Sequence, residues 1–218
     1  MAELSAEAGR VQRNYADLQS RIVAAGERVG RDTTDVRICV ACKYFEIEAM
    51  EQLALAGIRL VGENRLQNMV AKQAAFPDVF EWHFIGALQS RKVAEVASRV
   101  ELIHSVASDS VVERINQLGA AAPGVLVQVN VSGEPSKAGV APEQLEQFIA
   151  SLNTRPLGLM TMPPPAADGE ASRPYFRALA SLAQNFDLTQ LSMGTSQDFE
   201  VAVEEGATVV RIGSGLFA

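Results

Sequence analysis

The sequence predicts an α/β fold, a single-domain (β/α)8 TIM barrel with an extra N-terminal helix. Short apolar runs rich in β-branched residues alternate with segments of helical period, which is typical of βα units and a parallel sheet. There are eight such runs, the number that a closed barrel requires. The 218 residues are also about the length of one barrel domain. An open doubly wound sheet is the competing architecture, but a run at the very C-terminus favours closure.

The eight expected strands are Arg37–Cys42, Ile58–Gly62, Glu81–Ile85, Glu101–Ser105, Val125–Val131, Pro156–Met160, Gln190–Met193 and Thr208–Ile212. Residues 1–30 are expected to carry the N-terminal helix, and residues 36–218 the barrel. The helix covers Ala6–Val29, with Val11, Leu18, Ile22 and Val29 along its apolar face. We expect this helix to lie over the bottom of the barrel.

Breaking and capping residues set the other helix limits. Helices are expected over Glu46–Ala56, Val111–Leu118, Pro142 to about Leu152, and Gln197–Glu205. Gly57 can end the first of these in the left-handed conformation, and Pro142 suits the first turn of the third. The run Pro163–Gly169 predicts a loop after the sixth strand.

Composition excludes several classes of protein. The 19 basic and 26 acidic residues give a net charge of −7, which argues against a generally basic nucleic-acid surface. No apolar run reaches the ~18 residues that a membrane helix needs, and the first residues do not resemble a secretory signal. Two cysteines cannot build a disulfide scaffold. We therefore expect a cytoplasmic protein without nucleic-acid or membrane partners.

Lys43 directly follows the first expected strand. Active sites of such barrels lie at the carboxyl ends of the strands. If Lys43 points into this mouth, alternation turns Cys39 and Ala41 inward and Val40 and Cys42 toward the helices. Burial would disfavour the charged ammonium, and a neutral amine can form a Schiff base with an aldehyde. The alternative is a lysine that extends to solvent at a strand end.

Cys39 and Cys42 form a C-x-x-C pattern that could suggest a redox pair. Residues three apart on a strand face opposite sides, so the two thiols cannot meet without breaking the strand. A redox role is therefore disfavoured.

Small residues follow the seventh and eighth strands, at Gly194–Ser196 and Gly213–Gly215. Such loops let backbone N–H groups approach a phosphate, and barrels often bind phosphate after these two strands. Each loop alone could be an ordinary βα turn. Together, on neighbouring strands, they favour a phosphate site.

Arg211 lies on the eighth strand, where alternation places it on the same face as Val209 and Gly213, and we expect this face to point inward. A charged residue inside a barrel needs a partner, either a carboxylate or a ring nitrogen of a bound ligand. The two histidines, His83 and His104, cannot form a three-histidine zinc site, and no metal is expected. Both are expected to be hydrogen-bonded residues of the barrel wall, with His83 near enough to the rim to touch a cofactor ring.

Seven segments taken together resemble the pyridoxal-phosphate homeostasis proteins (the YggS/PROSC group). They cover the barrel nearly end to end. They are VACK ending at Lys43, VGENRLQ from Val61, WHFIGALQSRK from Trp82, LIHSV from Leu102, VQVNVSGEPSKAG from Val127, GLMTM from Gly158, and LSMGTSQDFEVAVEEGATVVRIGSGLF from Leu191.

The resemblance implies a fold-type III barrel like the N-terminal domain of alanine racemase. It also implies pyridoxal 5′-phosphate (PLP), held as an internal aldimine on Lys43, with Arg211 facing the pyridine nitrogen. The further cofactor-binding positions that it implies are Asn64, His83, Met193, Gly194, Ser196, Gly213 and Ser214.

The implied function is intracellular PLP homeostasis or delivery by a monomer, with apo PLP-dependent enzymes as transient partners and no strong turnover. An arginine cannot give the ring nitrogen the full proton that makes PLP a strong electron sink. The alternatives are a PLP-dependent racemase that uses Tyr44 as its second acid–base group, and a barrel enzyme for a phosphorylated sugar or aldehyde. Whether Lys137 forms a second PLP site stays open.

The sequence departs from the family pattern around the lysine. Cys42 stands in place of the usual serine, and Tyr44-Phe45-Glu46 in place of Thr-Lys-Pro. Loss of that second lysine makes transfer of PLP between two neighbouring amines less available.

Overall fold

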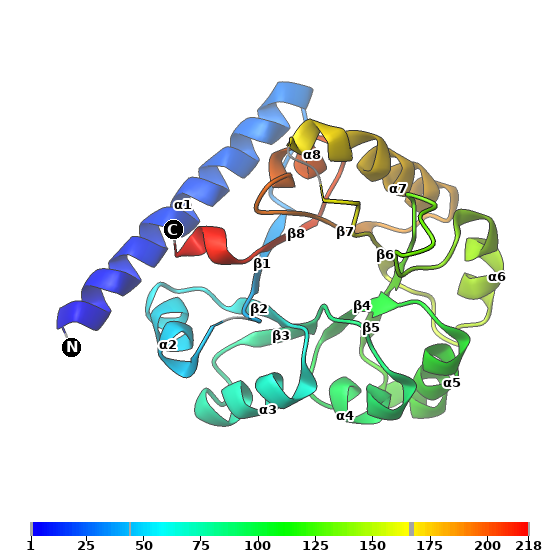
Figure 1. Ribbon diagram of the computed structural model, residues 1–218, viewed down its shortest axis with the longest axis horizontal. Coiled ribbons are helices and arrows are strands. Elements are labelled where there is room, and N and C mark those ends of the chain that lie inside the picture. The colour runs from blue at the N-terminus through cyan, green and yellow to red at the C-terminus, as the bar shows by residue number, and fades with distance from the viewer. Residues whose placement is uncertain (1, 44, 166–167, 218) are drawn as a thin grey trace.

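A computed structural model describes residues 2–43, 45–165 and 168–217, and it confirms the closed barrel. All eight strands are parallel, each pairs with the next along the chain, and the last pairs with the first (Figure 1). The strands are β1 Arg37–Ala41, β2 Leu60–Glu63, β3 Glu81–Phe84, β4 Leu102–Val106, β5 Gly124–Gln128, β6 Gly158–Met160, β7 Gln190–Thr195 and β8 Val209–Ile212. Every expected strand is present, with ends displaced by at most three residues.

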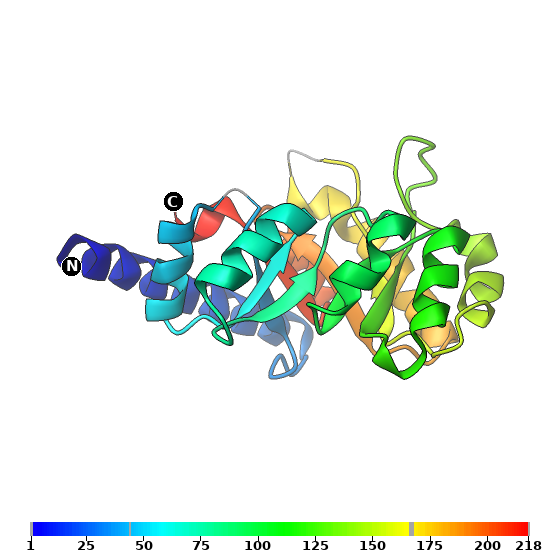
Figure 2. The same ribbon diagram turned by 90° about the horizontal axis from the view of Figure 1, so that it is seen from below.

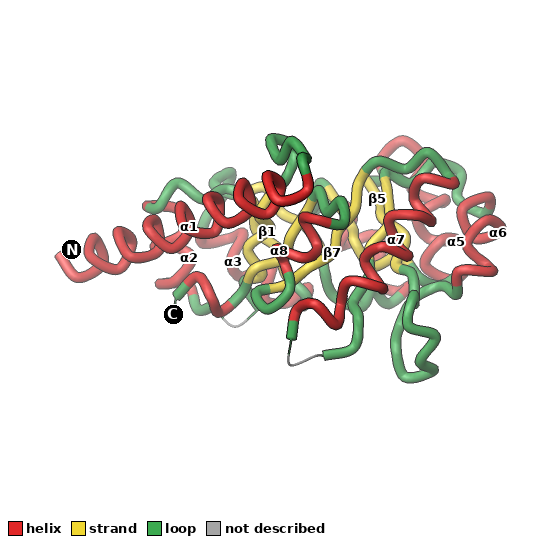
Figure 3. Tube along the Cα trace, turned by 90° about the horizontal axis from the view of Figure 1, so that it is seen from above, coloured by secondary structure: helices red, strands yellow, loops and turns green. Residues whose placement is uncertain are grey.

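The helices form an outer ring around the strands (Figure 1), and in the side view of Figure 3 the strands lie between red helices. They are α1 Ala2–Val29, α2 Ile47–Leu55, α3 Leu66–Ala75, α4 Val93–Ala97, α5 Asp109–Leu118, α6 Leu145–Ala150, α7 Arg173–Asn185 and α8 Phe199–Glu204. Gly57 ends α2 with a φ of +80°, as expected. In the described part of the chain, β8 is followed by a single 3-10 turn, Ser214–Leu216.

The placement of α1 over the barrel bottom is wrong. This helix packs along the outside of the barrel, against α8 and α2, and its N-terminal part extends beyond the ring (Figures 1 and 2). It covers the part of the wall that a helix after β8 would otherwise cover. Val11, Leu18 and Ile22 are buried as expected, but Val29 is 49% exposed because it is the last residue of the helix.

Ion pairs add to the contact between α1 and α8. Arg21 and Arg28 of α1 each bind Glu200 of α8, with N–O distances of 2.7 and 2.9 Å. The N-terminal helix is thus an integral part of the barrel wall. No helix in the described residues is both long and apolar enough to cross a membrane.

The apolar core has an outer and an inner part. The outer layer lies between strands and helices and includes Val40 and Cys42, whereas Cys39 packs inside the barrel with Leu60 and Val209. This confirms the predicted alternation along β1. A second inner cluster joins Leu102, Leu126 and Met160.

Candidate functional site

Arg211 of β8 lies inside the barrel and is 5% exposed. Its Nη1 donates to Ser192 Oγ at 2.6 Å, and its Nη2 donates to the Thr161 carbonyl at 2.9 Å and contacts Met162 Sδ at 2.8 Å. Burial lowers the pKa of the guanidinium to about 10, so it stays charged at neutral pH. No carboxylate of the described residues lies within ion-pair distance. Three of its five N–H groups are used in these contacts.

The loops after β7 and β8 meet, as expected for a phosphate site. The Gly213 N–H donates to Ser196 Oγ at 3.4 Å. Asp198 accepts from the Thr195 N–H at 2.6 Å and from the Thr195 hydroxyl at 3.0 Å, so the Thr195 hydroxyl is already used as a donor. The side chain of Ser214 lies outside the described part of the structure.

The helix after β7 is shorter than expected. α8 begins at Phe199, two residues later than the expected start, and has six residues. So short a helix provides little dipole. Anion binding here would therefore depend on the loop N–H and hydroxyl groups.

Lys43 lies in a turn that the Phe45 N–H closes by donating to the Cys42 carbonyl at 3.0 Å. The residue is exposed, so the expectation of a partly buried lysine is wrong. The reason is that β1 ends at Ala41, and the barrel wall no longer encloses the chain two residues later. The turn still borders the phosphate loops, because the Ala41 carbonyl lies 3.7 Å from the position of a Cβ on Gly213.

A buried ion pair lies beneath this turn. Lys72 Nζ of α3 donates to the Cys42 carbonyl at 2.6 Å and binds Glu63 Oε2 at 2.7 Å. The other Glu63 oxygen accepts from the Asn64 N–H at 2.8 Å. Lys72 was missed in the sequence analysis, because nothing in the sequence around this lysine indicates that its side chain reaches into the barrel wall. The pair connects the Lys43 turn to the loop after β2.

Asn64 carries an unsatisfied acceptor. Its Oδ1 is buried and has no hydrogen-bond partner among the described residues. A buried polar atom of this kind requires a ligand or water. Asn64 follows β2 at the same end of the barrel as Lys43, Arg211 and the two loops. PLP would need an amine, a partner for its ring nitrogen and an anion site, and these groups are of those kinds. These residues fit the cofactor.

The two histidines are hydrogen-bonded interior residues, as predicted. His83 Nε2 contacts Glu81 Oε1 at 3.0 Å, and its Nδ1 contacts His104 Nε2 at 2.9 Å. His104 Nδ1 contacts Ser192 Oγ at 2.7 Å. Burial lowers the pKa of His83 to about 4 and that of His104 well below its usual value. His83 therefore reaches Arg211 through two other residues, and its direct contact with a cofactor ring stays a prediction.

Met193 is fully buried in the outer layer between strands and helices. Its neighbour Ser192 points into the barrel, so alternation turns the Met193 side chain away from the mouth. Any contribution of Met193 to cofactor binding would therefore come from its backbone.

The cysteines are separate, free and buried. Cys39 lies inside the barrel, where burial raises its thiol pKa to about 12, and burial also raises the pKa of Cys42 in the outer layer. No group of three histidine, cysteine or acidic side chains suited to a metal ion occurs within the described residues.

Comparison with known proteins gives a consistent family. The model of the alanine racemase N-terminal domain matches residues 11–218. The pyridoxal phosphate homeostasis protein of Aquifex aeolicus is 41% identical over 211 residues, covering 90% of this chain and 92% of the relative. That of Pseudomonas aeruginosa is 39% identical over 217 residues, covering 95% and 94%.

Among solved structures, PipY of Synechococcus elongatus PCC7942, with PLP bound, superposes with a TM-score of 0.76. It is 30% identical, and the match covers 95% of this chain and all of that one. The chain belongs to the pyridoxal phosphate homeostasis protein family.

Proposed function

We propose that the chain binds PLP at the barrel mouth and carries or delivers it within the cell, without strong catalytic turnover. The observation that carries this proposal is Arg211, a buried guanidinium whose partners in the described residues are a hydroxyl, a carbonyl and a thioether. A buried cation without a carboxylate partner is costly unless another acceptor satisfies it. The pyridine nitrogen of PLP is such an acceptor.

The remaining groups of PLP match the other residues of the mouth. The Lys43 amine would hold the aldehyde, and Gly194, Ser196 and Gly213 would hold the phosphate. Asn64 would offer its unsatisfied oxygen to a donor near the ring. When bound, PLP supplies a reactive aldehyde and a pyridine ring that withdraws electrons.

The same residues argue for a carrier. Arginine remains a donor at neutral pH, so a ring nitrogen facing Arg211 stays unprotonated and withdraws electrons weakly. A racemase also needs a second proton carrier opposite the lysine. Tyr15 lines a pocket at the other end of the barrel and Tyr175 lies on α7, while Tyr44 lies outside the described residues. The exposure of Lys43 suits exchange of a bound aldehyde with other amines.

A titration with PLP tests this proposal. We expect a visible absorption band with the wild-type chain, and its loss in Lys43→Ala. We also expect no rapid deuterium exchange at Cα of free amino acids. Rapid exchange that Tyr44→Phe abolishes would establish the racemase alternative instead.

A further inference from the structure

A chain of hydrogen bonds crosses the interior of the barrel. It runs from Glu81 at the start of β3 through His83, His104 and Ser192 to Arg211. Its four contacts measure 3.0, 2.9, 2.7 and 2.6 Å. The four members after Glu81 are at most 5% exposed.

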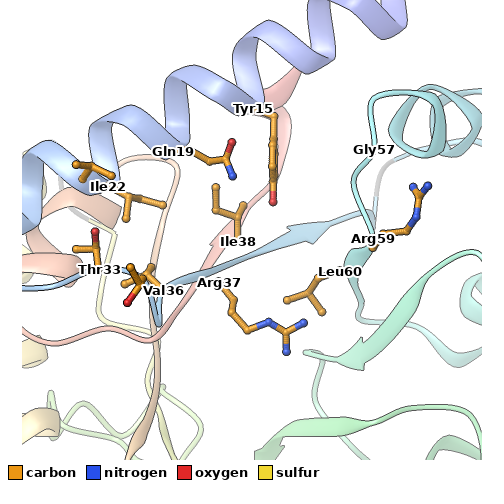
Figure 4. Close-up of a pocket in the computed structure, with 12 residues that line it drawn as sticks. Tyr15, Gln19, Ile22, Thr33, Val36, Arg37, Ile38, Gly57, Arg59 and Leu60 are labelled. Atoms are coloured by element: carbon orange, nitrogen blue, oxygen red, sulfur yellow. The ribbon is translucent and has the colours of Figure 1, made fainter.

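The two ends of the chain differ in their surroundings. Arg211 lies toward the mouth, whereas the Glu81 side chain, 33% exposed, lies at the opposite end and binds Arg37 at 3.0 Å. Arg37 lines a pocket of about 460 Å³ between α1 and the first residues of β1 and β2 (Figure 4). This series of hydrogen bonds thus connects the solvent-facing Arg37–Glu81 ion pair to the proposed cofactor site.

The charged ends fix the direction of every hydrogen bond. Arginine can only donate and an ionised carboxylate can only accept. The hydrogen bond from Arg37 lowers the pKa of Glu81, so this carboxylate is ionised at neutral pH. His83 must then donate from Nε2 and accept at Nδ1, and His104 must do the same. The Ser192 hydroxyl therefore donates to His104 and turns its lone pairs toward Arg211.

We propose that Glu81, His83, His104 and Ser192 are positioning residues that hold the Arg211 guanidinium as a donor toward the cofactor ring; the inference rests on the proposed function. If the direction were reversed, the Ser192 oxygen would have to accept from both His104 and Arg211, and it would be a weaker acceptor for the buried guanidinium than a hydroxyl that donates to His104. Neutral histidines also keep further positive charge away from Arg211. Glu81 thereby sets the geometry at the mouth from the far end of the barrel.

Two substitutions at the Arg37–Glu81 ion pair distinguish positioning of the Arg211 guanidinium from a purely structural role of the ion pair. Arg37→Met and Glu81→Met remove the same salt bridge, but only the second removes the acceptor of His83. We expect Arg37→Met to keep the PLP affinity of the wild type. Glu81→Met should weaken PLP binding about five- to tenfold, the factor that corresponds to one lost hydrogen bond. Equal losses in the two variants would overturn the inference.

Two further variants cover the case in which Glu81→Met fails to fold. Ser192→Ala removes the acceptor of Arg211 itself and should weaken PLP binding by a similar factor. Glu81→Gln keeps an acceptor oxygen and should restore the wild-type affinity. Circular dichroism establishes that each variant is folded. Wild-type affinity in a folded Ser192→Ala variant would overturn the inference.

A spectroscopic measurement tests the direction of these hydrogen bonds in the protein without PLP. In the ¹⁵N-labelled wild type at pH 7, nitrogen shifts should report both histidines as neutral with the proton on Nε2. A proton on Nδ1 of either histidine would overturn the assigned direction. If the wild type takes up no PLP, the proposed function falls and this inference with it, whereas PLP uptake with a wrong tautomer overturns the inference alone.

Discussion

Two buried cations near the mouth of this barrel differ in their partners. Lys72 and Arg211 are both buried cations, but Lys72 is paired with Glu63, whereas Arg211 is held by neutral acceptors. A buried ion pair adds little net stability, yet removing one partner is costly because the other charge is left unpaired. Lys72 therefore fixes the Cys42 carbonyl next to Lys43, whereas Arg211 has no carboxylate partner among the described residues.

Lys72→Met tests the buried pair. The substitution leaves Glu63, which is fully buried, without its cation. We expect the free energy of unfolding to fall by roughly 3–5 kcal/mol in urea denaturation. Arg37→Met breaks a partly exposed pair and should cost about 0–1 kcal/mol. Similar losses in the free energy of unfolding of the two variants would contradict the expectation that breaking the buried Lys72–Glu63 pair is the costlier change.

The site features that could be predicted from the sequence are those that depend on where a strand ends and on the alternation of side chains along it. Arg211 faces inward, and Ser196 and Gly213 meet, because these features follow from the order of the strands. The depth of His83 could not be predicted, since alternation gives the direction of a side chain but not its height in a tilted barrel. The exposure of Lys43 depended on where β1 ends, which was displaced by one residue.

At the scale of elements, the loop from β7 to α8 has its shape set by packing. Gly194 has a φ of +90°, and a Cβ at this position would lie 2.5 Å from the Ala202 Cβ. Gly206 has a φ of +103°, but its nearest neighbour would lie 3.6 Å away. The two glycines share a strained backbone region, and only Gly194 also lacks space.

Gly194→Ala and Gly206→Ala form a matched pair. Backbone strain alone costs about 1–3 kcal/mol, and forcing a methyl group into packed atoms adds about as much. We expect Gly194→Ala to lower the melting temperature more and to weaken PLP binding. Gly206→Ala should leave PLP affinity unchanged. Loss of affinity in Gly206→Ala alone would contradict this assignment of the phosphate loop.

The strands could be predicted because β-branched apolar runs are a local signal, whereas helix docking is not local. The apolar face of α1 was identified through Val11, Leu18 and Ile22, and all three are buried. Periodicity shows that a helix buries a face but not which surface covers it. α1 packs against α8 and α2, and it also contacts the short turn that follows β8.

At the scale of the whole molecule, the neutral interior histidines couple stability to pH. Burial lowers the pKa of His83 to about 4, against about 6.5 in an unfolded chain, and that of His104 also falls. Between these values the unfolded chain binds more protons, so stability falls as pH decreases from 6.5. The slope approaches about 1.4 kcal/mol per pH unit for each histidine.

Urea denaturation at pH 7, 6 and 5 measures this dependence. We expect little change above pH 6.5 and a progressive loss below it, before most carboxylates titrate. Histidine proton shifts recorded over the same range provide the control, because both rings should stay neutral to pH 5. Constant stability from pH 7 to 5 would contradict the neutral interior chain.

Lys43 is the residue that we propose holds PLP at the mouth of this barrel. The most direct measurement is to incubate the purified chain with PLP, reduce it with borohydride and map the modified peptide. We expect a visible absorption band that borohydride bleaches, with the pyridoxyl group on Lys43. A label on Lys137 or another lysine with Lys43 unmodified, or no uptake of PLP by the wild type, would contradict it.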